Sequence, residues 1–357
     1  MTTRADMGRH LSLTPGSLTK TFVVEVHTQE PSDYLDDVVG ASNVEHTEDA
    51  YLFRVHAPDG AFWVDQVDTR FWTFHTDMPM REAFAFLRDR VEVRRDLDWM
   101  WLPSEHLRHV WPGAVSQRVR TDFEGHGFLG DSAAARDLKV QLIGRDAEAL
   151  LDLIAKDARY QPAVSFHSVQ AHIQDPELGW VNEGVNRMGR FAVSGDSLEL
   201  HLQFVRAVVQ RYRYLVELCE QKAVAWRPFE GDNDGGRGGT VQGGPINIAF
   251  SRPIEDLLRF LDELFAVRRP FRLWGVPEIV GGVAEVEAVD LHVGQRLRMD
   301  VGASWMRVYL EEGGCGNTVA RLISNLQHHF DGALRLVDTD LHAAMTARSP
   351  TLRPISY

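Results

Sequence analysis

The stretch RLRMDVGASWMRVYLEEGGCGNTVARLISNLQHHF, residues 296–330, carries the strongest fold signal in the chain. Apolar and polar residues alternate over 296–301 and again over 305–310, which is typical of two strands with one buried face. Asn317 is a residue type that caps helices. Five apolar residues then recur on one helical face: Val319, Leu322, Ile323, Leu326 and Phe330. The stretch therefore predicts two strands followed by a helix.

The segments on either side complete a module that spans residues 246–340. Further strands are predicted at 246–250, 271–274, 283–293 and 333–337. A helix begins at Ser251 and keeps one apolar face as far as Phe265. Asp331 and Gly332 end the second helix of the module.

Two earlier parts of the chain show the same order of elements, β-α-β-β-β-α. An aromatic-rich module spans residues 19–124, and a second module spans residues 137–229. Such strands form antiparallel sheets, with helices packed on one face. The sequence therefore predicts the α+β class, as tandem β-α-β-β-β-α modules.

Residues 198–204 allow two interpretations. Leu198, Leu200, Leu202 and Phe204 alternate as a strand, and the preceding Gly195-Asp196 pair is good turn chemistry for a hairpin. We prefer this strand. The alternative is one long helix over residues 198–219, because apolar residues also recur there at helical spacing.

Glycine-rich stretches predict the boundaries between the modules. Residues 230–245 have the composition of a flexible linker, and residues 125–136 of a shorter one. Residues 1–18 are expected to form a flexible N-terminus and residues 341–357 a C-terminal tail.

The composition restricts the classes of function. The chain has 357 residues and a net charge of -13, which makes nucleic-acid binding unlikely. Its two cysteines are too few for a disulfide framework, and they do not predict a cysteine-based zinc site. The N-terminus has no secretory signal, and no apolar run is long enough to span a membrane. We therefore expect a soluble, cytoplasmic protein, and the preference for arginine over lysine indicates a bacterial source.

Residues Gly313, Gly314, Cys315, Gly316 and Asn317 lie between a predicted strand and a strong helix, where backbone N–H groups can bind an anion or a cofactor. This layout resembles the pyrophosphate loop of the GNAT acetyltransferases, and the resemblance implies an acyl-CoA ligand. The chain departs from that family's pattern because two glutamates directly precede the glycines. The alternative is a turn that needs positive φ. Cys315 is either a thiol activated by the helix start or an incidental loop residue.

A second candidate site lies near His106 and His109, which a short helix would place on one face. With Asp98 they could ligate a metal ion. The alternative is that these histidines hydrogen-bond to backbone groups.

Five of the nine tryptophans fall in the first module: Trp63, Trp72, Trp99, Trp101 and Trp111. An exposed cluster of this kind would bind a partner, because tryptophan is frequent at interaction hot spots. The alternative is a core built from large side chains.

Two smaller groups have polar chemistry. Asp122, Glu124 and His126 could serve acid–base catalysis, or they form a solvated loop. His328 and His329 near a helix end are explained by a favourable interaction with the helix dipole.

The chain contains no P-loop, nucleophile-elbow, zincin or kinase signature. We therefore expect a non-enzymatic scaffold whose partner is another protein. The alternatives are a GNAT-like acyltransferase that uses the Gly313–Gly316 loop and a module that binds a small ligand. The sequence identifies no particular cofactor.

Overall fold

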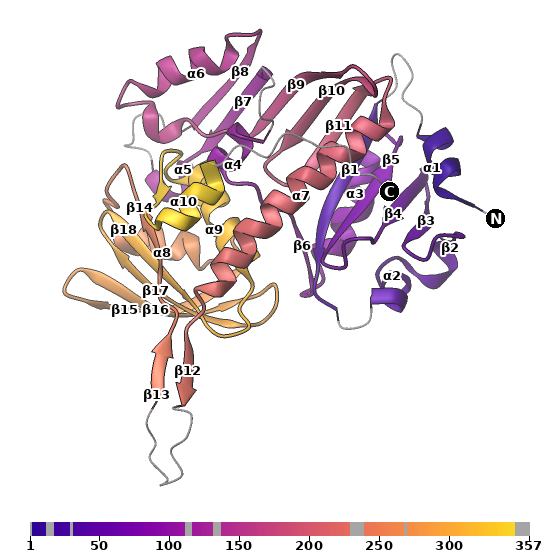
Figure 1. Cartoon of the computed structure of the whole chain (residues 1–357). Coiled ribbons are helices and arrows are strands. Elements are labelled where there is room, and N and C mark those ends of the chain that lie inside the picture. Colours follow the sequence, from indigo (N-terminus) through magenta and orange to yellow (C-terminus); the bar gives the residue numbers. More distant parts are fainter. Residues whose placement is uncertain are drawn as a thin grey trace.

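The computed structural model describes residues 2–11, 18–28, 31–110, 116–130, 137–228, 239–267 and 270–346. In this part of the chain, antiparallel strands form two large sheets and one hairpin, and helices pack between and beside the sheets (Figure 1). The predicted α+β class is confirmed. None of the described helices is long and apolar enough to cross a membrane.

The larger sheet contains strands of both of the first two predicted modules. Its members are β1 Thr19–Val26, β2 Val44–His46, β3 Leu52–Ala57, β4 Gly60–Asp65, β5 Phe71–Thr76, β6 Leu97–Trp99, β7 Ser116–Glu124, β8 Asp137–Ile143, β9 Ser168–Asp175, β10 Gly179–Asn186 and β11 Arg190–Gly195. Their order is β2-β3-β4-β5-β1-β11-β10-β9-β7-β8, and β6 also pairs with β1. Every residue of β1 is buried, because this strand is paired along both edges and its side chains pack into apolar clusters on both faces of the sheet.

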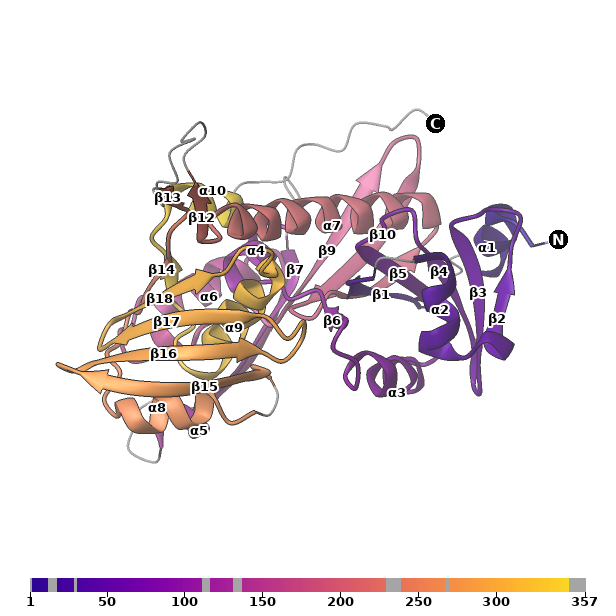
Figure 2. The same cartoon turned by 90° about the horizontal axis from the view of Figure 1, so that it is seen from below.

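The smaller sheet contains β14 Ile246–Ala249, β15 Leu273–Val280, β16 Val283–Asp290, β17 Arg296–Gly302, β18 Trp305–Leu310 and β19 Arg335–Leu336. Its order is β15-β16-β17-β18-β14-β19. Two helices, α8 Leu257–Leu264 and α9 Gly316–His329, share its apolar core (Figure 2). The two strands and the helix expected within residues 296–330 are thus confirmed. The helix caps differ, because α9 is capped by Cys315 and α8 begins only after Asp256.

A long helix, α7 Leu198–Gln221, runs from the larger sheet to the smaller one (Figures 1 and 2). The strand expected over residues 198–204 is therefore wrong, and the alternative of one long helix is the correct interpretation. Ser197 caps it by accepting a hydrogen bond from the backbone N–H of Leu200.

The wrong prediction of a strand over residues 198–204 is explained by the way these residues pack. Leu200 and Phe204 pack into the core beneath the larger sheet. Leu198 and Leu202 instead pack against Trp63, which lies in a separate small cluster. Because two faces of these first turns are apolar, every second residue is apolar, and that spacing is typical of a strand.

The remaining helices are α1 Arg4–His10, α2 Pro31–Val39, α3 Met80–Val91, α4 Ser104–Arg108, α5 His126–Leu129, α6 Ala147–Ala155 and α10 Thr339–Thr346, with short 3₁₀ turns at Ala41–Asn43 and Gln161–Ala163. Several lie where loose segments were expected. Helix α1 buries Met7, and α10 buries Leu341, Ala344 and Met345. Helix α5 contacts α8 of the smaller sheet's core. In the glycine-rich segment 230–245, residues 230–238 lie outside the described part. Residues Gly239–Gln242 form β13, which pairs with β12 Ala225–Pro228.

The three expected modules are arranged differently in the sheets. In the first and third, the initial strand pairs with the strand that directly precedes the second long helix, as β1 does with β5 before α3 and β14 does with β18 before α9. In the middle one, β8 pairs with β7, a strand assigned from sequence to the first module. The threefold repeat therefore stays a prediction.

Helix α9 lies at the contact between the part of the molecule that contains the larger sheet and the part that contains the smaller sheet. All but one of its residues are buried, including polar residues that face the segment 97–104 and Tyr212 of α7. These polar residues hydrogen-bond across the contact: Asn317 to Trp99 O and Tyr212 Oη, Arg321 to Asp98, Ser324 to Leu102 O, and Gln327 to the N–H of Ser104. This contact places the N-terminus of α9 beside the end of β1.

Candidate metal centre

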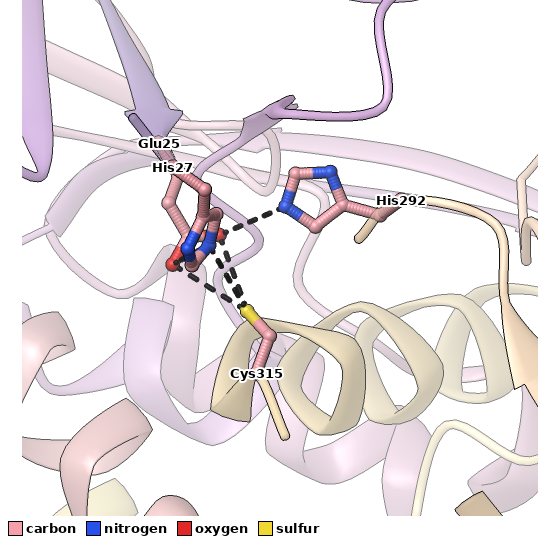
Figure 3. A group of neighbouring side chains, drawn as sticks. All are labelled: Glu25, His27, His292 and Cys315. Atoms are coloured by element: carbon pink, nitrogen blue, oxygen red, sulfur yellow. Dashed lines mark hydrogen bonds and ion pairs between the residues drawn. The ribbon is translucent and has the colours of Figure 1, made fainter. Parts of the chain in front are cut away.

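Four side chains from distant parts of the chain converge where β1 meets α9. Glu25 lies near the end of β1, and His27 follows directly after this strand. His292 follows β16, and Cys315 is the N-cap residue of α9. Figure 3 shows all four side chains directed toward one point, with Cys315 at the helix start and His292 approaching from the opposite side to His27.

The distances between the four polar groups are short and similar. Cys315 Sγ lies 3.3 Å from His27 Nε2 and 3.7 Å from each carboxylate oxygen of Glu25. Glu25 Oε1 lies 3.3 Å from His27 Nε2, and Glu25 Oε2 lies 3.5 Å from His292 Nε2. One ligand atom from each residue lies within 4.8 Å of all the others. The four groups thus surround a common centre.

This geometry differs from that of a thiol nucleophile with a histidine base. In a nucleophile–histidine–carboxylate triad the two ring nitrogens serve different partners, one facing the nucleophile and the other the carboxylate. Here a single nitrogen, His27 Nε2, faces both Cys315 Sγ and Glu25 Oε1. The side chains therefore converge on one point and do not form a relay.

The buried ring of His292 is not fully hydrogen-bonded. Its side chain is completely buried, its Nε2 lies 3.5 Å from Glu25 Oε2 without forming a regular hydrogen bond, and its Nδ1 has no hydrogen-bond partner within the described part of the chain. Leaving a buried polar group unsatisfied costs about 1–3 kcal/mol. A ligand at the centre of the cluster would remove this cost at Nε2.

Charges around the cluster favour the carboxylate form of Glu25. Burial opposes its ionisation, but the nearby imidazoles of His27 and His292 and the charge of Arg70 outweigh burial and hold the pKa of Glu25 well below its usual range. Burial and the Glu25 charge raise the pKa of the Cys315 thiol well above its ordinary value. Cys315 is therefore a neutral thiol unless a cation binds to its sulfur.

Arg70 connects the cluster to a second carboxylate. Its Nε donates a hydrogen bond of 2.8 Å to Glu25 Oε1, and its other nitrogens donate at 2.6 and 3.1 Å to Glu220. Glu220 Oε1 in turn accepts a hydrogen bond of 2.9 Å from the backbone N–H of Gly316. Such outer contacts fix the orientation of a carboxylate that binds a metal.

The cluster borders an open pocket of about 570 Å³. His27 and Cys315 line it together with Arg70, Glu220 and the backbone of Gly313–Gly314. The side chain of His27 is 30% exposed, whereas those of Glu25 and His292 are completely buried. A small solute can therefore reach the centre from the side of His27 and Cys315.

The glycines of the predicted anion loop have structural roles. Gly313 has φ of +81°, as the turn interpretation requires. A Cβ atom at Gly316 would lie 2.1 Å from the carbonyl oxygen of Val216, so this glycine permits close packing of α9 on α7. The N–H of Gly316 is already bound by Glu220, and Asn317 is completely buried. Of the five loop residues, only Cys315 contributes a side chain to the cluster.

Replacing Gly316 with alanine is expected to lower the free energy of unfolding by about 1–3 kcal/mol, because the clash is with backbone, which cannot rotate away. Urea unfolding of the two proteins measures the difference. The control is Gly244→Ala, where an added Cβ meets no atom within 4 Å. Equal stability of G316A and the parent would contradict the packing role.

The structure does not bring His106, His109 and Asp98 together as a metal site. Asp98 is buried against Arg321 and accepts a hydrogen bond from the indole of Trp101. His109 Nδ1 pairs with the backbone oxygen of Glu105, as the alternative interpretation expected. His106 is buried, and neither of its nitrogens has a hydrogen-bond partner among the described residues.

Four of the five tryptophans proposed as a partner-binding patch are buried. Trp63, Trp72, Trp99 and Trp101 are at most 5% exposed, and they pack into two apolar clusters beside the larger sheet. Trp111 lies outside the described residues. The described tryptophans therefore form core, and they do not present a surface to a partner.

The helix dipole does not explain His328 and His329. Burial, followed by the charge of Arg187, lowers the pKa of His329 to about 4 and lowers the pKa of His328 further. Both rings are consequently neutral near pH 7, and a neutral ring gains nothing from the dipole.

Sequence reasoning identified Cys315 but missed Glu25, His27 and His292. Glu25 and His27 are two positions apart at the end of β1, where extended backbone places such side chains on one face, and this was the available local signal. His292 follows β16 and carries no motif. Only the contact between α9 and the end of β1 brings these residues together.

The fold and the cluster define an α+β protein with a candidate metal centre beside an open pocket. A family model described as "MJECL33-like protein" matches residues 4–344, so the chain belongs to this family. The chain is similar to "Uncharacterized protein MJECL33" of Methanocaldococcus jannaschii, with 22% identity over 361 residues that cover 88% of this chain and 85% of that protein. No solved structure matches the chain.

Proposed function

We propose that this protein binds a divalent transition metal ion through Cys315, His27, His292 and Glu25. The observation that carries the proposal is the spacing of the four ligand atoms. Bonds of 2.0–2.3 Å place the ligands of a tetrahedral zinc ion roughly 3.3–3.7 Å apart. The separations of Cys315 from His27 and Glu25, and of Glu25 from the two histidines, are 3.3 to 3.7 Å and fall in this range, and His292 lies within 4.8 Å of Cys315 and His27.

The donor set favours zinc or a similar ion. One sulfur, two imidazole nitrogens and one carboxylate oxygen are the ligands of borderline metals, whereas calcium and magnesium require oxygen ligands. Metal binding deprotonates the thiol, which its surroundings otherwise keep neutral. Glu25 and His27 come from the end of β1 in the larger sheet, whereas His292 and Cys315 come from the part that contains the smaller sheet. The ion would therefore connect these two parts and face the pocket.

The other roles expected from the sequence stay predictions. Protein binding rested on exposed tryptophans, and those described are buried. Acyl transfer rested on a free helix N-terminus, and Glu220 binds its first N–H. Metal binding is the role with direct geometric support.

Elemental analysis of the purified protein tests the proposal. We expect one equivalent of bound metal per chain, or stoichiometric uptake of zinc by the metal-free protein. Cys315→Ser and His292→Ala should weaken zinc binding by more than the roughly 10–100-fold that loss of an outer hydrogen-bond partner costs. Cobalt substitution should give a sulfur-to-cobalt charge-transfer band that disappears in C315S.

The matched control is Cys219→Ala, because Cys219 is the other buried cysteine and lies in the core, away from the cluster. C219A should keep both the metal and the cobalt band. Zinc binding that is equally strong in the parent and in C315S, with both proteins folded by circular dichroism, would overturn the proposal.

A further inference from the structure

A second group of possible metal ligands lies at the opposite end of α9. Glu124 ends β7, and His328 and His329 are the last two residues of the helix. One ligand atom from each lies within 4.8 Å of the other two. Helix α9 has 14 residues, so its two ends are about 20 Å apart, and this group is separate from the Cys315 cluster.

His329 is oriented as metal-bound histidines usually are. Its Nδ1 lies 3.0 Å from the backbone oxygen of Glu124. A carbonyl can only accept a hydrogen bond, so Nδ1 carries the proton and Nε2 keeps a free lone pair. Donation of one ring N–H to a carbonyl is the common way in which proteins fix the ring of a ligating histidine.

His328 is a buried group in need of a partner. The residue is 5% exposed, and its Nδ1 has no hydrogen-bond partner within the described part of the chain. Its ring lies 4.6 Å from that of His329, measured between ring centroids. The unsatisfied imidazole thus lies beside the other two ligand groups.

The side-chain ammonium of Lys139 already forms an ion pair with the carboxylate of Glu124. Lys139 Nζ lies 2.8 Å from Glu124 Oε1 and 3.0 Å from Asp122 Oδ1. The lysine side chain is 59% exposed, so it can move toward Asp122 alone at little cost. Lys139 and a metal ion would therefore compete for Glu124.

We propose that Glu124, His328 and His329 form a second metal site, which takes a borderline divalent ion such as zinc, nickel or cobalt. Three protein ligands leave coordination positions open to water, and Glu124 lies at the surface. This site is exchangeable, whereas the Cys315 cluster offers four ligands. The inference does not depend on metal binding at Cys315.

Calorimetric titration of the metal-free full chain with zinc chloride alone tests the site. We expect two classes of binding, of which the weaker is lost in His329→Ala and Glu124→Gln and kept in Cys315→Ser. Lys139→Gln should strengthen the weaker class, because it removes the competing ammonium. His329→Gln provides a second variant if H329A is unstable by thermal melting.

The matched control is His126→Ala, since this exposed histidine lies two residues from Glu124 but outside the ligand group. H126A should bind zinc as the parent does. Retention of the weaker class in both folded His329 variants would overturn the proposal, and so would its equal loss in H126A, which would indicate adventitious binding to surface histidines.

Discussion

Replacing Arg321 with methionine is expected to lower the free energy of unfolding by about 3–5 kcal/mol, the usual cost of removing one partner from a buried ion pair. Arg321 on α9 is completely buried and pairs with Asp98 beside the larger sheet and with Asp290 of β16. Its Nε also donates a hydrogen bond of 2.9 Å to the backbone oxygen of Phe271. Without the guanidinium, two carboxylates with side chains 2% exposed would lose the cation that they share, and Asp98 would keep Arg272 at 3.7 Å and the Trp101 indole, while Asp290 would keep the hydroxyl of Thr318.

Urea unfolding at pH 7 measures the loss. The control is Arg298→Met, because Arg298 also pairs with two carboxylates, Glu285 and Asp300, but its side chain is 47% exposed. Surface pairs of this kind contribute about 0–1 kcal/mol. If R321M and R298M lose equal amounts of stability, the buried ion cluster does not hold α9 in place.

The second large effect is a loss of stability in mild acid. Burial lowers the pKa of His75 to about 3 and that of His167 to about 4, and it lowers the pKa of His106 well below its ordinary value. In the unfolded chain these groups titrate near pH 6.5. The unfolded state therefore binds more protons between pH 6.5 and 4, and stability falls as the pH decreases through this window.

The size of the acid effect follows from the number of groups. Each histidine that stays neutral only in the folded state contributes up to about 1.4 kcal/mol per pH unit, so these three contribute about 4 kcal/mol per unit below pH 6, and His328 and His329, whose pKa values burial also lowers, act in the same direction. Urea unfolding at pH 7.5, 6 and 5 measures the slope. A stability that does not change from pH 7.5 to 5 would contradict these pKa directions.

His106 gives the sharpest test of this explanation. Neither of its ring nitrogens has a hydrogen-bond partner among the described residues, so His106→Leu removes a titrating group without breaking a described hydrogen bond. We expect H106L to gain about 2 kcal/mol relative to the parent between pH 7.5 and pH 5. The control His172→Gln, at an exposed position, should leave the slope unchanged.

The sequence predicted helices and strands correctly where each element has one buried face, because the spacing of apolar residues then follows the secondary structure. Residues 296–330 have one buried face in each strand and one in the helix, and the expected elements are present. Residues 198–204 pack on two sides, and there the same rules gave a strand in place of a helix. The glycines of 313–316 were recognised as unusual, but their packing against α7 depends on a contact that the local sequence does not contain.

The candidate site was less accessible to prediction, because its members are far apart in the chain. Glu25 and Cys315 are separated by 290 positions, and no spacing rule connects them. The pairing of Arg321 with Asp98 and Asp290 brings their elements together, and this pairing is itself a tertiary contact. The sequence showed which groups have suitable chemistry, whereas the docking of α9 determines which of them meet.

The central position of β1 also determines how the protein can be divided for study. One edge of β1 pairs with β5, and the other pairs with β11 and β6. A fragment that ends at residue 124 would lack β11 and leave half of a fully buried strand edge open. Unpaired edges of this kind recruit other chains and lead to aggregation. Expression fragments should therefore keep residues 19–195 in one piece, although the sequence predicts a glycine-rich boundary at residues 125–136 within this range.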